Sequence, residues 1–423
     1  MKVEADNHMT GKNIRHIATA LMMSSWLGAA SQTPVVGTLR AYVEGDETSL
    51  PVIELNSDDR IVVEFDCLTR RILDLEYSVT HCDRNGQPSD LQPSEYLSGF
   101  AVNAVTDYSP SSGTTTDYVN YRICLPNSDV QMLLSGRYNV AVFMAGHPDS
   151  IVAQASILVY EQLAGIEAEV AKPTGSVSER HAQDVRLSVD YSGLMVNDVF
   201  NELNVSILQN GCPYTSRTDL KPKQIVGNRL VYSYAGDLLM AGGNEFRRLD
   251  LRYLRQAPIN YNRVDYVAPY FHITPPADES RAFKPYFSET DQNGQYIIYA
   301  QSVNNADDHY RTADYVYVHP TLETEPVLDG DVFVCGAFCN WQLSSDNQMR
   351  YNFAAKRYEG DLRLKQGVYD YIYVCRTYHD GKVDMERFEG SHSATANNYL
   401  FLVFFRPSTA DYEQLVGAAW IGM

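Results

Sequence analysis

The feature that most constrains the fold is a succession of short apolar segments, separated by turn residues, across residues 38–160. In the segment 74–82, apolar and polar residues alternate, and this period of two is typical of a strand with one buried face. Asn85 and Gly86 follow as a pair that favours a tight turn. Short strands at this spacing predict an antiparallel β-sandwich. The expected strands are 38–42, 60–67, 74–82, 120–125, 136–145 and 153–160.

The same pattern resumes after a linker at residues 171–176 that contains Pro and Gly. The expected strands in this part are 185–191, 203–209, 229–234, 246–252, 267–273, 286–288, 296–301, 314–320, 331–335, 357–362, 368–376 and 398–405. The turn at 291–294 is expected to close a hairpin between 286–288 and 296–301. Counted from Asp291, the sixth position is not Gly and the twelfth is not Glu, as an EF-hand loop requires, so the turn does not predict a calcium site. The fold class is therefore all-β, with tandem antiparallel β-sandwich domains.

Residues 1–32 have the layout of a secretory signal peptide. Lys12 and Arg15 precede a short apolar run, which small residues follow. The run is too short to span a bilayer, and no later segment approaches twenty apolar residues. We therefore expect an exported protein whose mature chain begins near Gln32 and does not insert into a membrane.

Length and charge narrow the possibilities further. A chain of 423 residues has room for about three domains of ordinary size, and we expect them at 33–165, 176–320 and 321–423. The formal net charge of −19 argues against a nucleic-acid partner, because phosphate binding requires clustered Lys and Arg. Tyrosine outnumbers the other aromatic residues, with 30 Tyr against 15 Phe and 3 Trp, and it suits both strands and hydrated interfaces.

A catalytic site is not expected, although His81, Cys82 and Asp83 are three reactive residue types in a row. Neighbouring side chains on an extended chain point to opposite faces, so these residues cannot converge on one atom. The sequence also lacks the serine-hydrolase, zinc-protease, P-loop and dinucleotide-binding motifs. We therefore predict no enzyme activity, and no catalytic, cofactor-binding or metal-binding residues, cofactor or small-molecule substrate.

The seven cysteines are an odd number, which leaves at least one thiol unpaired in a monomer. Two disulfides are conceivable, Cys67–Cys82 and Cys335–Cys339. The alternative is that these residues are small buried hydrophobes.

Residues 88–100 are expected to run across the surface, since Pro88 and Pro93 exclude a central strand. The apolar side chains of this loop need something to lie against. We therefore expect Tyr96, Leu97 and Phe100 to bind a partner.

Several sequence runs resemble, in order, the type IX secretion system plug protein family. THCD, SEYLSGF, YRICLPN and LSGRYNVAVF are similar to its first domain, which places that domain at 33–165. Further matching runs are LNVSILQNG, GGNEFRRLDLR, ADYVYV, VFVCGAFCNW, LRLKQGVYDYIYV, FFRP and DYEQLVG. Cys335 and Cys339 depart from the pattern, because the resemblance leads us to expect ordinary strand and turn residues where these cysteines stand.

The resemblance implies a function through a protein partner. Such a plug is periplasmic and is peripherally associated with the outer membrane through that partner, the outer-membrane translocon barrel of type IX secretion. It closes the periplasmic opening of the barrel when no cargo is transiting.

The last part of the chain leaves two alternatives open. VFVCGAFCNW and GVYDYIYV look like an E-set, immunoglobulin-like module of the kind that includes glycogen-binding domains. Trp341 and Trp420 would then either stack on sugar rings or lie buried under the rim of the sandwich. Exposed coplanar aromatics would favour an exported glycan-binding protein, and a carboxyl pair in a deep cleft would favour a carbohydrate-active enzyme.

Overall fold

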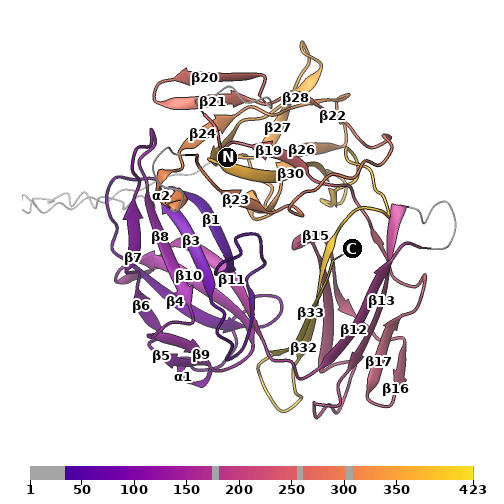
Figure 1. Cartoon of the computed structure of the whole chain (residues 1–423). Coiled ribbons are helices and arrows are strands. Elements are labelled where there is room, and N and C mark those ends of the chain that lie inside the picture. Colours follow the sequence, from indigo (N-terminus) through magenta and orange to yellow (C-terminus); the bar gives the residue numbers. More distant parts are fainter. Residues whose placement is uncertain (1–33, 174–180, 255–260, 302–307, 423) are drawn as a thin grey trace, which may run out of the picture. The chain divides into compact units, whose positions relative to one another are not determined.

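Strands form almost all of the regular structure in a computed structural model of the chain (Figure 1). The model describes residues 34–173, 181–254, 261–301 and 308–422. The all-β class of antiparallel sandwiches is confirmed for these residues. The leader expected at 1–32 lies outside them. No helix among the described residues is long and apolar enough to cross a membrane.

The first sandwich consists of two sheets that pack face to face. One sheet is formed, in order across it, by β1 (Val36–Val43), β3 (Ile61–Cys67), β8 (Val119–Leu125) and β7 (Asp107–Pro110). The other is formed by β2 (Val52–Glu54), β11 (His147–Tyr160), β10 (Gly136–Met144), β4 (Leu75–Cys82) and β6 (Val102–Ala104). Adjacent strands are antiparallel, except that β2 and β11 are parallel.

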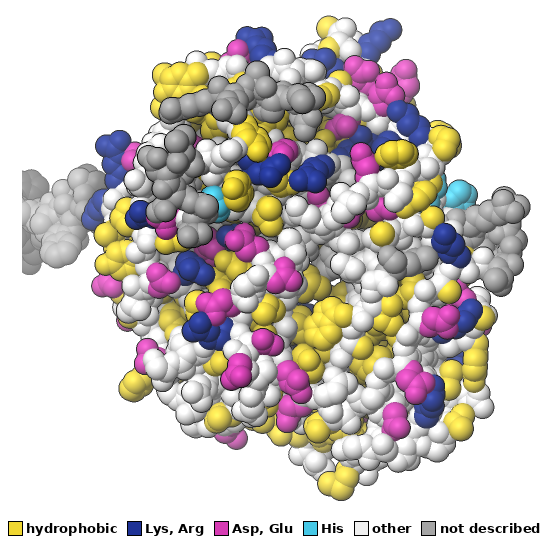
Figure 2. All heavy atoms as spheres, viewed as in Figure 1, with side chains coloured by type: hydrophobic (Ala, Val, Ile, Leu, Met, Phe, Trp, Pro, Cys, Tyr) yellow, Lys and Arg dark blue, Asp and Glu magenta, His cyan; other side chains and the backbone are white. Residues whose placement is uncertain are grey.

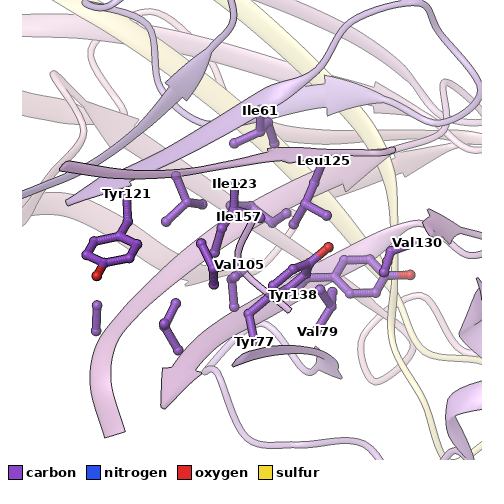
Figure 3. Packing of buried hydrophobic residues seen from close by; sticks show 14 of the residues in the cluster. Ile61, Tyr77, Val79, Val105, Tyr121, Ile123, Leu125, Val130, Tyr138 and Ile157 are labelled. Atoms are coloured by element: carbon purple, nitrogen blue, oxygen red, sulfur yellow. The ribbon is translucent and has the colours of Figure 1, made fainter. Parts of the chain in front are cut away.

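The core of this sandwich follows from the period-two alternation of its strands. Tyr77 and Val79 of β4 share the core with Tyr138 of β10 (Figure 3). From the facing sheet, Ile61 and Ile123 pack into the same cluster. Every strand expected between residues 38 and 160 is present, within two residues of its expected bounds except β11, which begins at residue 147 where 153 was expected.

The second sandwich combines strands from two distant parts of the sequence. One sheet is formed by β12 (Gly165–Ala171), β13 (Ala182–Asp190), β17 (Arg229–Ser233) and β16 (Gln224–Val226), with β18 (Leu239–Ala241) also paired to β13. The other is formed by β15 (Cys212–Leu220), β14 (Leu203–Gln209), β32 (Asn398–Phe405) and β33 (Gln414–Gly422). The sheets therefore do not follow the boundary expected after residue 320, because strands from both sides of it share one core.

The third sandwich is formed by the sequence between these two parts. Its larger sheet contains, in order, β19 (Arg247–Asp250), β30 (Gly367–Thr377), β26 (Gly330–Cys335), β27 (Gln348–Asn352), β28 (Arg357–Glu359), β25 (Thr321–Glu323) and β22 (Asp278–Glu279). The strands β23 (Tyr296–Ile298) and β31 (Val383–Asp384) also pair with β30. The smaller sheet contains β20 (Arg263–Val267), β21 (Tyr270–Thr274), β24 (Tyr315–Val318) and β29 (Leu362–Lys365).

Short elements complete the described part of the chain. They are α1 (Pro93–Tyr96), α2 (His309–Thr312), the 3₁₀ turn η2 (Ala337–Cys339), and the paired strands β5 (Leu97–Gly99) and β9 (Val130–Met132).

Three local expectations in the third sandwich are wrong. Residues 357–362 are not one strand, because β28 ends at Glu359 and β29 begins at Leu362 in the other sheet. Residues 286–288 form no strand, and β23 pairs with β30 instead of closing a hairpin across the turn at 291–294. Asp291 in this turn accepts hydrogen bonds from the backbone N–H groups of Asn293 (3.0 Å) and Phe246 (2.5 Å), which ties the turn to the start of β19. Residues 267–273 are not one strand, because the chain turns between β20 and β21.

The strand β32 is buried on both faces, which explains its nearly continuous apolar sequence. Phe401 and Val403 lie in the core of the second sandwich. The alternate residues Leu400 and Leu402 form a separate cluster with Leu158 of the first sandwich. One strand therefore belongs to a core and to the contact between two sandwiches.

Charged side chains are mixed on the face of the molecule drawn in Figure 2. Lys and Arg side chains lie singly or in small groups there, among Asp and Glu side chains and scattered apolar ones.

Candidate functional site

The three residues expected to bind a partner differ in exposure. Tyr96 at the end of α1 is 4% exposed and Leu97 at the start of β5 is 3% exposed, and both belong to the core of the first sandwich. Phe100 is 74% exposed. Burial thus leaves Phe100 as the side chain of the three that a partner can reach.

Local chemistry explains why the chain turns inward at Tyr96. Pro93 occupies the first turn of α1, where its missing N–H costs nothing, and the Glu95 carboxylate accepts a hydrogen bond from the backbone N–H of Gln92 (2.7 Å). The short helix directs the Tyr96 ring toward His81, with ring centroids 5.9 Å apart. Gln92, Pro93 and Glu95 therefore form a helix start that the loop expectation did not anticipate.

The side chains of His81, Cys82 and Asp83 do not converge on a common point. The imidazole of His81 contacts the Ser89 hydroxyl (Nδ1, 3.0 Å) and the Ser135 carbonyl oxygen (Nε2, 3.3 Å). Asp83 instead accepts hydrogen bonds from backbone N–H groups of its own turn. Burial lowers the pKa of His81, which favours the neutral ring. These residues hold the strand end and the turn together.

The outer face of β3 carries two buried carboxylates, Glu64 and Asp66. They alternate with core residues and point away from the first core, yet they are only 3% and 0% exposed. Strands β24 and β29 of the third sandwich supply partners for Asp66, because Lys365 Nζ lies 2.7 Å and the Tyr315 hydroxyl 2.6 Å from its Oδ2. Arg40 pairs with Glu64 at 3.0 Å. We call these five residues the Asp66 cluster.

Electrostatics make the members of the Asp66 cluster depend on one another. Burial raises the pKa of Asp66 and lowers that of Lys365. Burial also opposes ionisation of Glu64, but Arg40 and Lys365 hold the pKa of Glu64 below its ordinary value. Removing one member would leave another charge buried and unpaired, which is costly.

A second contact joins the first sandwich to the second. The backbone N–H of Arg84 and its guanidinium donate to the Glu413 carboxylate at 2.6 and 2.7 Å, and Glu413 is 2% exposed. Arg84 lies in the turn at 83–86 that the sequence predicts, so this turn is an attachment point. The apolar cluster around Leu158 and Leu402 adds to the same contact.

Other candidate sites lie elsewhere in the third and second sandwiches. Trp341 is 6% exposed and packs edge-on against Phe246, whereas Trp420 is 51% exposed and packs against Tyr160. Trp341 is therefore not available as a sugar platform. Across the described residues, no group of three or more His, Cys, Asp or Glu side chains is placed to hold a metal ion. All seven cysteines are free thiols.

The sequence expectations missed the Asp66 cluster and Glu413. A pattern for the cluster was present in β3, because Glu64 and Asp66 interrupt an otherwise apolar run at alternate positions. Carboxylates on the second face of a strongly apolar strand indicate either that this face is exposed to solvent or that a buried cation pairs with them. Only the fold shows that Lys365, which is distant in sequence, supplies the cation.

Comparisons with known proteins agree with this architecture. The family model described as "Type 9 secretion system plug protein 1st domain" matches residues 36–161, which span the first sandwich. A crystal structure of a hypothetical protein from Parabacteroides merdae is similar to this chain, with a TM-score of 0.87 and 31% sequence identity. The similarity covers 93% of this chain and 98% of that protein. No curated protein matches the chain. From the matched domain and the similarity along the rest of the chain, we conclude that this protein belongs to the type IX secretion system plug protein family.

Proposed function

We propose that the protein is a periplasmic plug that binds the outer-membrane translocon barrel of type IX secretion. It closes the periplasmic opening of the barrel when no cargo is transiting, and it does so without chemical turnover. The observation that carries this proposal is the match of the first sandwich to the plug protein's first domain. The association with the outer membrane is peripheral and depends on the barrel.

The mechanical demands on such a plug are consistent with the contacts of the first sandwich. A gate that closes a wide pore must resist deformation when it is seated. The Asp66 cluster joins the first sandwich to the third, and the Arg84–Glu413 pair joins it to the second. Lys365 and Asp66 are both buried, and Arg84 reaches a buried carboxylate on Glu413, so solvent screens these pairs less than it screens exposed ion pairs.

We place the barrel contact at the loop 88–100, with Phe100 as its anchor. The backbone around Phe100 is well fixed, because Asn103 Nδ2 donates to the Phe100 carbonyl oxygen at 2.8 Å. Gly99 precedes it at a φ of 113°, and a Cβ there would lie 1.8 Å from the Asp129 carbonyl oxygen. An exposed aromatic side chain on a fixed backbone is the kind of residue that can anchor an interface.

Replacing Phe100 tests the contact. Phe100→Ala should weaken barrel binding by about 2–4 kcal/mol, the range of an aromatic hot spot, while the free energy of unfolding changes little. Barrel recovered with the tagged protein from native membranes measures the first quantity, and thermal unfolding measures the second. Phe353→Ala is the matched control, because Phe353 is 78% exposed in the third sandwich, and it should bind normally.

Tyr96→Ala distinguishes a contact residue from a core residue. Because Tyr96 is buried, this change should destabilise the protein by about 3–5 kcal/mol, the cost of truncating a core aromatic. If Phe100→Ala recovered the barrel as well as the wild type does, the barrel contact would have to lie elsewhere on the surface.

Removing the whole protein from cells tests the plug role itself. The outer membrane should become more permeable to large solutes, and the wild-type protein supplied again should restore the barrier. Failure of the purified protein to bind the barrel would contradict the plug role. Unchanged outer-membrane permeability in cells that lack the protein would contradict it as well.

A further inference from the structure

Cys335 and Cys339 form a close pair of thiols at the end of β26 in the third sandwich. Cys335 ends β26, Cys339 ends η2, and their sulfur atoms are 3.9 Å apart. A disulfide bond requires about 2.05 Å, so the sulfurs must approach by roughly 2 Å, a distance that a change of side-chain rotamer covers. We propose that these two residues are a reactive dithiol that small-molecule disulfides oxidise to an intramolecular disulfide.

The two thiols differ in access, and this difference sets the order of reaction. Cys339 lines a surface cavity of about 680 Å³ that it shares with Thr38, Asn340 and Arg363. Cys335 is fully buried and does not line that cavity. An oxidant from solvent therefore meets Cys339 first, and Cys335 acts second from beneath it.

Ionisation favours the same order. Hydrogen bonding from Cys335 lowers the pKa of Cys339 below its ordinary value, and thiolate is the reactive form of cysteine. The same hydrogen bond, together with burial, raises the pKa of Cys335. Cys339, the more accessible member, is thus the better nucleophile of the pair.

The reaction is ordinary thiol–disulfide exchange and balances without another reagent. The Cys339 thiolate attacks one sulfur of a disulfide such as oxidised glutathione, forms a mixed disulfide and releases one glutathione thiolate. Cys335 then loses its proton to solvent and attacks the Cys339 sulfur, which releases the second glutathione. The two protein thiols are oxidised, and one small-molecule disulfide is reduced to two thiols.

A third cysteine provides the matched control. Cys212 belongs to the same apolar cluster as Cys335, but it is 1% exposed. Burial raises the pKa of Cys212 to about 11, so it should remain a thiol when the pair is oxidised.

The test is mass spectrometry and thiol counting on the full chain, reduced and then treated with oxidised glutathione. The treated protein should show five free thiols in denaturant in place of the seven of the reduced chain, with a Cys335–Cys339 disulfide in the peptide map. Alkylation of Cys339 in the folded protein should be at least about tenfold faster than that of any other cysteine. Seven remaining thiols, or a disulfide that links Cys212 to Cys339, would overturn the proposal.

Single substitutions separate the two roles. Cys335→Ser should stop the reaction at the mixed disulfide, so that one glutathione stays attached at Cys339. Cys339→Ser should take up no glutathione at residue 335. Cys212→Ser should still form the Cys335–Cys339 disulfide at the wild-type rate. Unchanged alkylation of the folded protein in Cys339→Ser would refute the assignment of Cys339 as the first nucleophile.

Discussion

Single residues in this protein are often polar and yet buried, and Asp370 on β30 is a clear case. Its carboxylate is fully buried, and its Oδ2 accepts hydrogen bonds from the backbone N–H groups of Gln292 and Gly294. Burial raises the pKa of Asp370 to about 7. The folded state therefore holds a proton that the unfolded chain releases near its ordinary pKa of about 4.

This difference predicts a pH dependence of stability. Between about pH 4 and pH 7 the folded state binds more protons than the unfolded state, so the contribution of Asp370 to the free energy of unfolding falls as pH rises. A difference of about three pKa units corresponds to at most about 4 kcal/mol. Asp370→Asn cannot ionise, so its stability relative to the wild type should rise by up to that amount over this range.

Denaturant unfolding of both proteins at several pH values measures the effect. The comparison with the wild type is necessary because the depressed pKa of Glu64 acts in the opposite direction. A stability difference that stays constant with pH would show that Asp370 is ionised in the folded protein at low pH.

At the scale of elements, strands with two buried faces connect the sandwiches. In β30, Tyr369 and Tyr371 lie in the third core, while Ile372 and Val374 lie in the cluster that contains Cys212 of β15. The strand β32 has the same character. A strand of this kind has no solvent-facing side, so it tolerates substitution poorly on either face.

Leu402→Ala tests this property of β32. If the outer face of β32 were exposed to solvent, the change would alter the free energy of unfolding by less than about 0.5 kcal/mol. Since Leu402 is 1% exposed and contacts the first sandwich, we expect a loss of about 2–5 kcal/mol. Chemical denaturation measures it, with the exposed Phe353→Ala as the control, and a loss as small as that of the control would contradict the packing.

Local pattern was enough to locate about half of the strands but not to pair them. The bounds of β14 and β32 coincide with the expected segments 203–209 and 398–405, because both are apolar runs of strand length. No pattern within either segment indicates that these two strands pair with each other. The strand β33 was missed because its Gly417, Ala418 and Ala419 are weak strand formers.

The candidate site was predictable only in part, for a related reason. An apolar side chain in a polar loop can either bind a partner or pack into the core of its own sandwich, and the sequence does not distinguish these two roles. The helix start at Gln92–Glu95 decided in favour of the core for Tyr96 and Leu97. Lys365 illustrates the same limit, because its role depends on a carboxylate in another sandwich.

At the scale of the whole molecule, the Asp66 cluster makes the first and third sandwiches depend on each other. Lys365→Met removes the cation from a buried carboxylate, and we expect a loss of about 3–5 kcal/mol in the free energy of unfolding. Arg70→Ala breaks an exposed ion pair with Asp117 and should cost less than about 1 kcal/mol. Calorimetry of both variants compares the two losses.

A second substitution distinguishes lost charge pairing from lost packing. The double variant Asp66→Asn, Lys365→Met should recover part of the stability, because no unpaired charge remains. A double variant no more stable than Lys365→Met would show that the cost arises from packing alone.

The sharing of the second sandwich between β14 and β32 has a consequence for how the chain is made. Domains that are continuous in sequence can fold one after another as synthesis proceeds from the N-terminus. The second sandwich cannot, because β14 has only β15 as a neighbour until β32 has been synthesised. The sheet that contains β14 therefore remains incomplete, with apolar faces exposed, while the entire third sandwich is translated. This delay makes the last strands of the chain the step that commits the protein to its folded state.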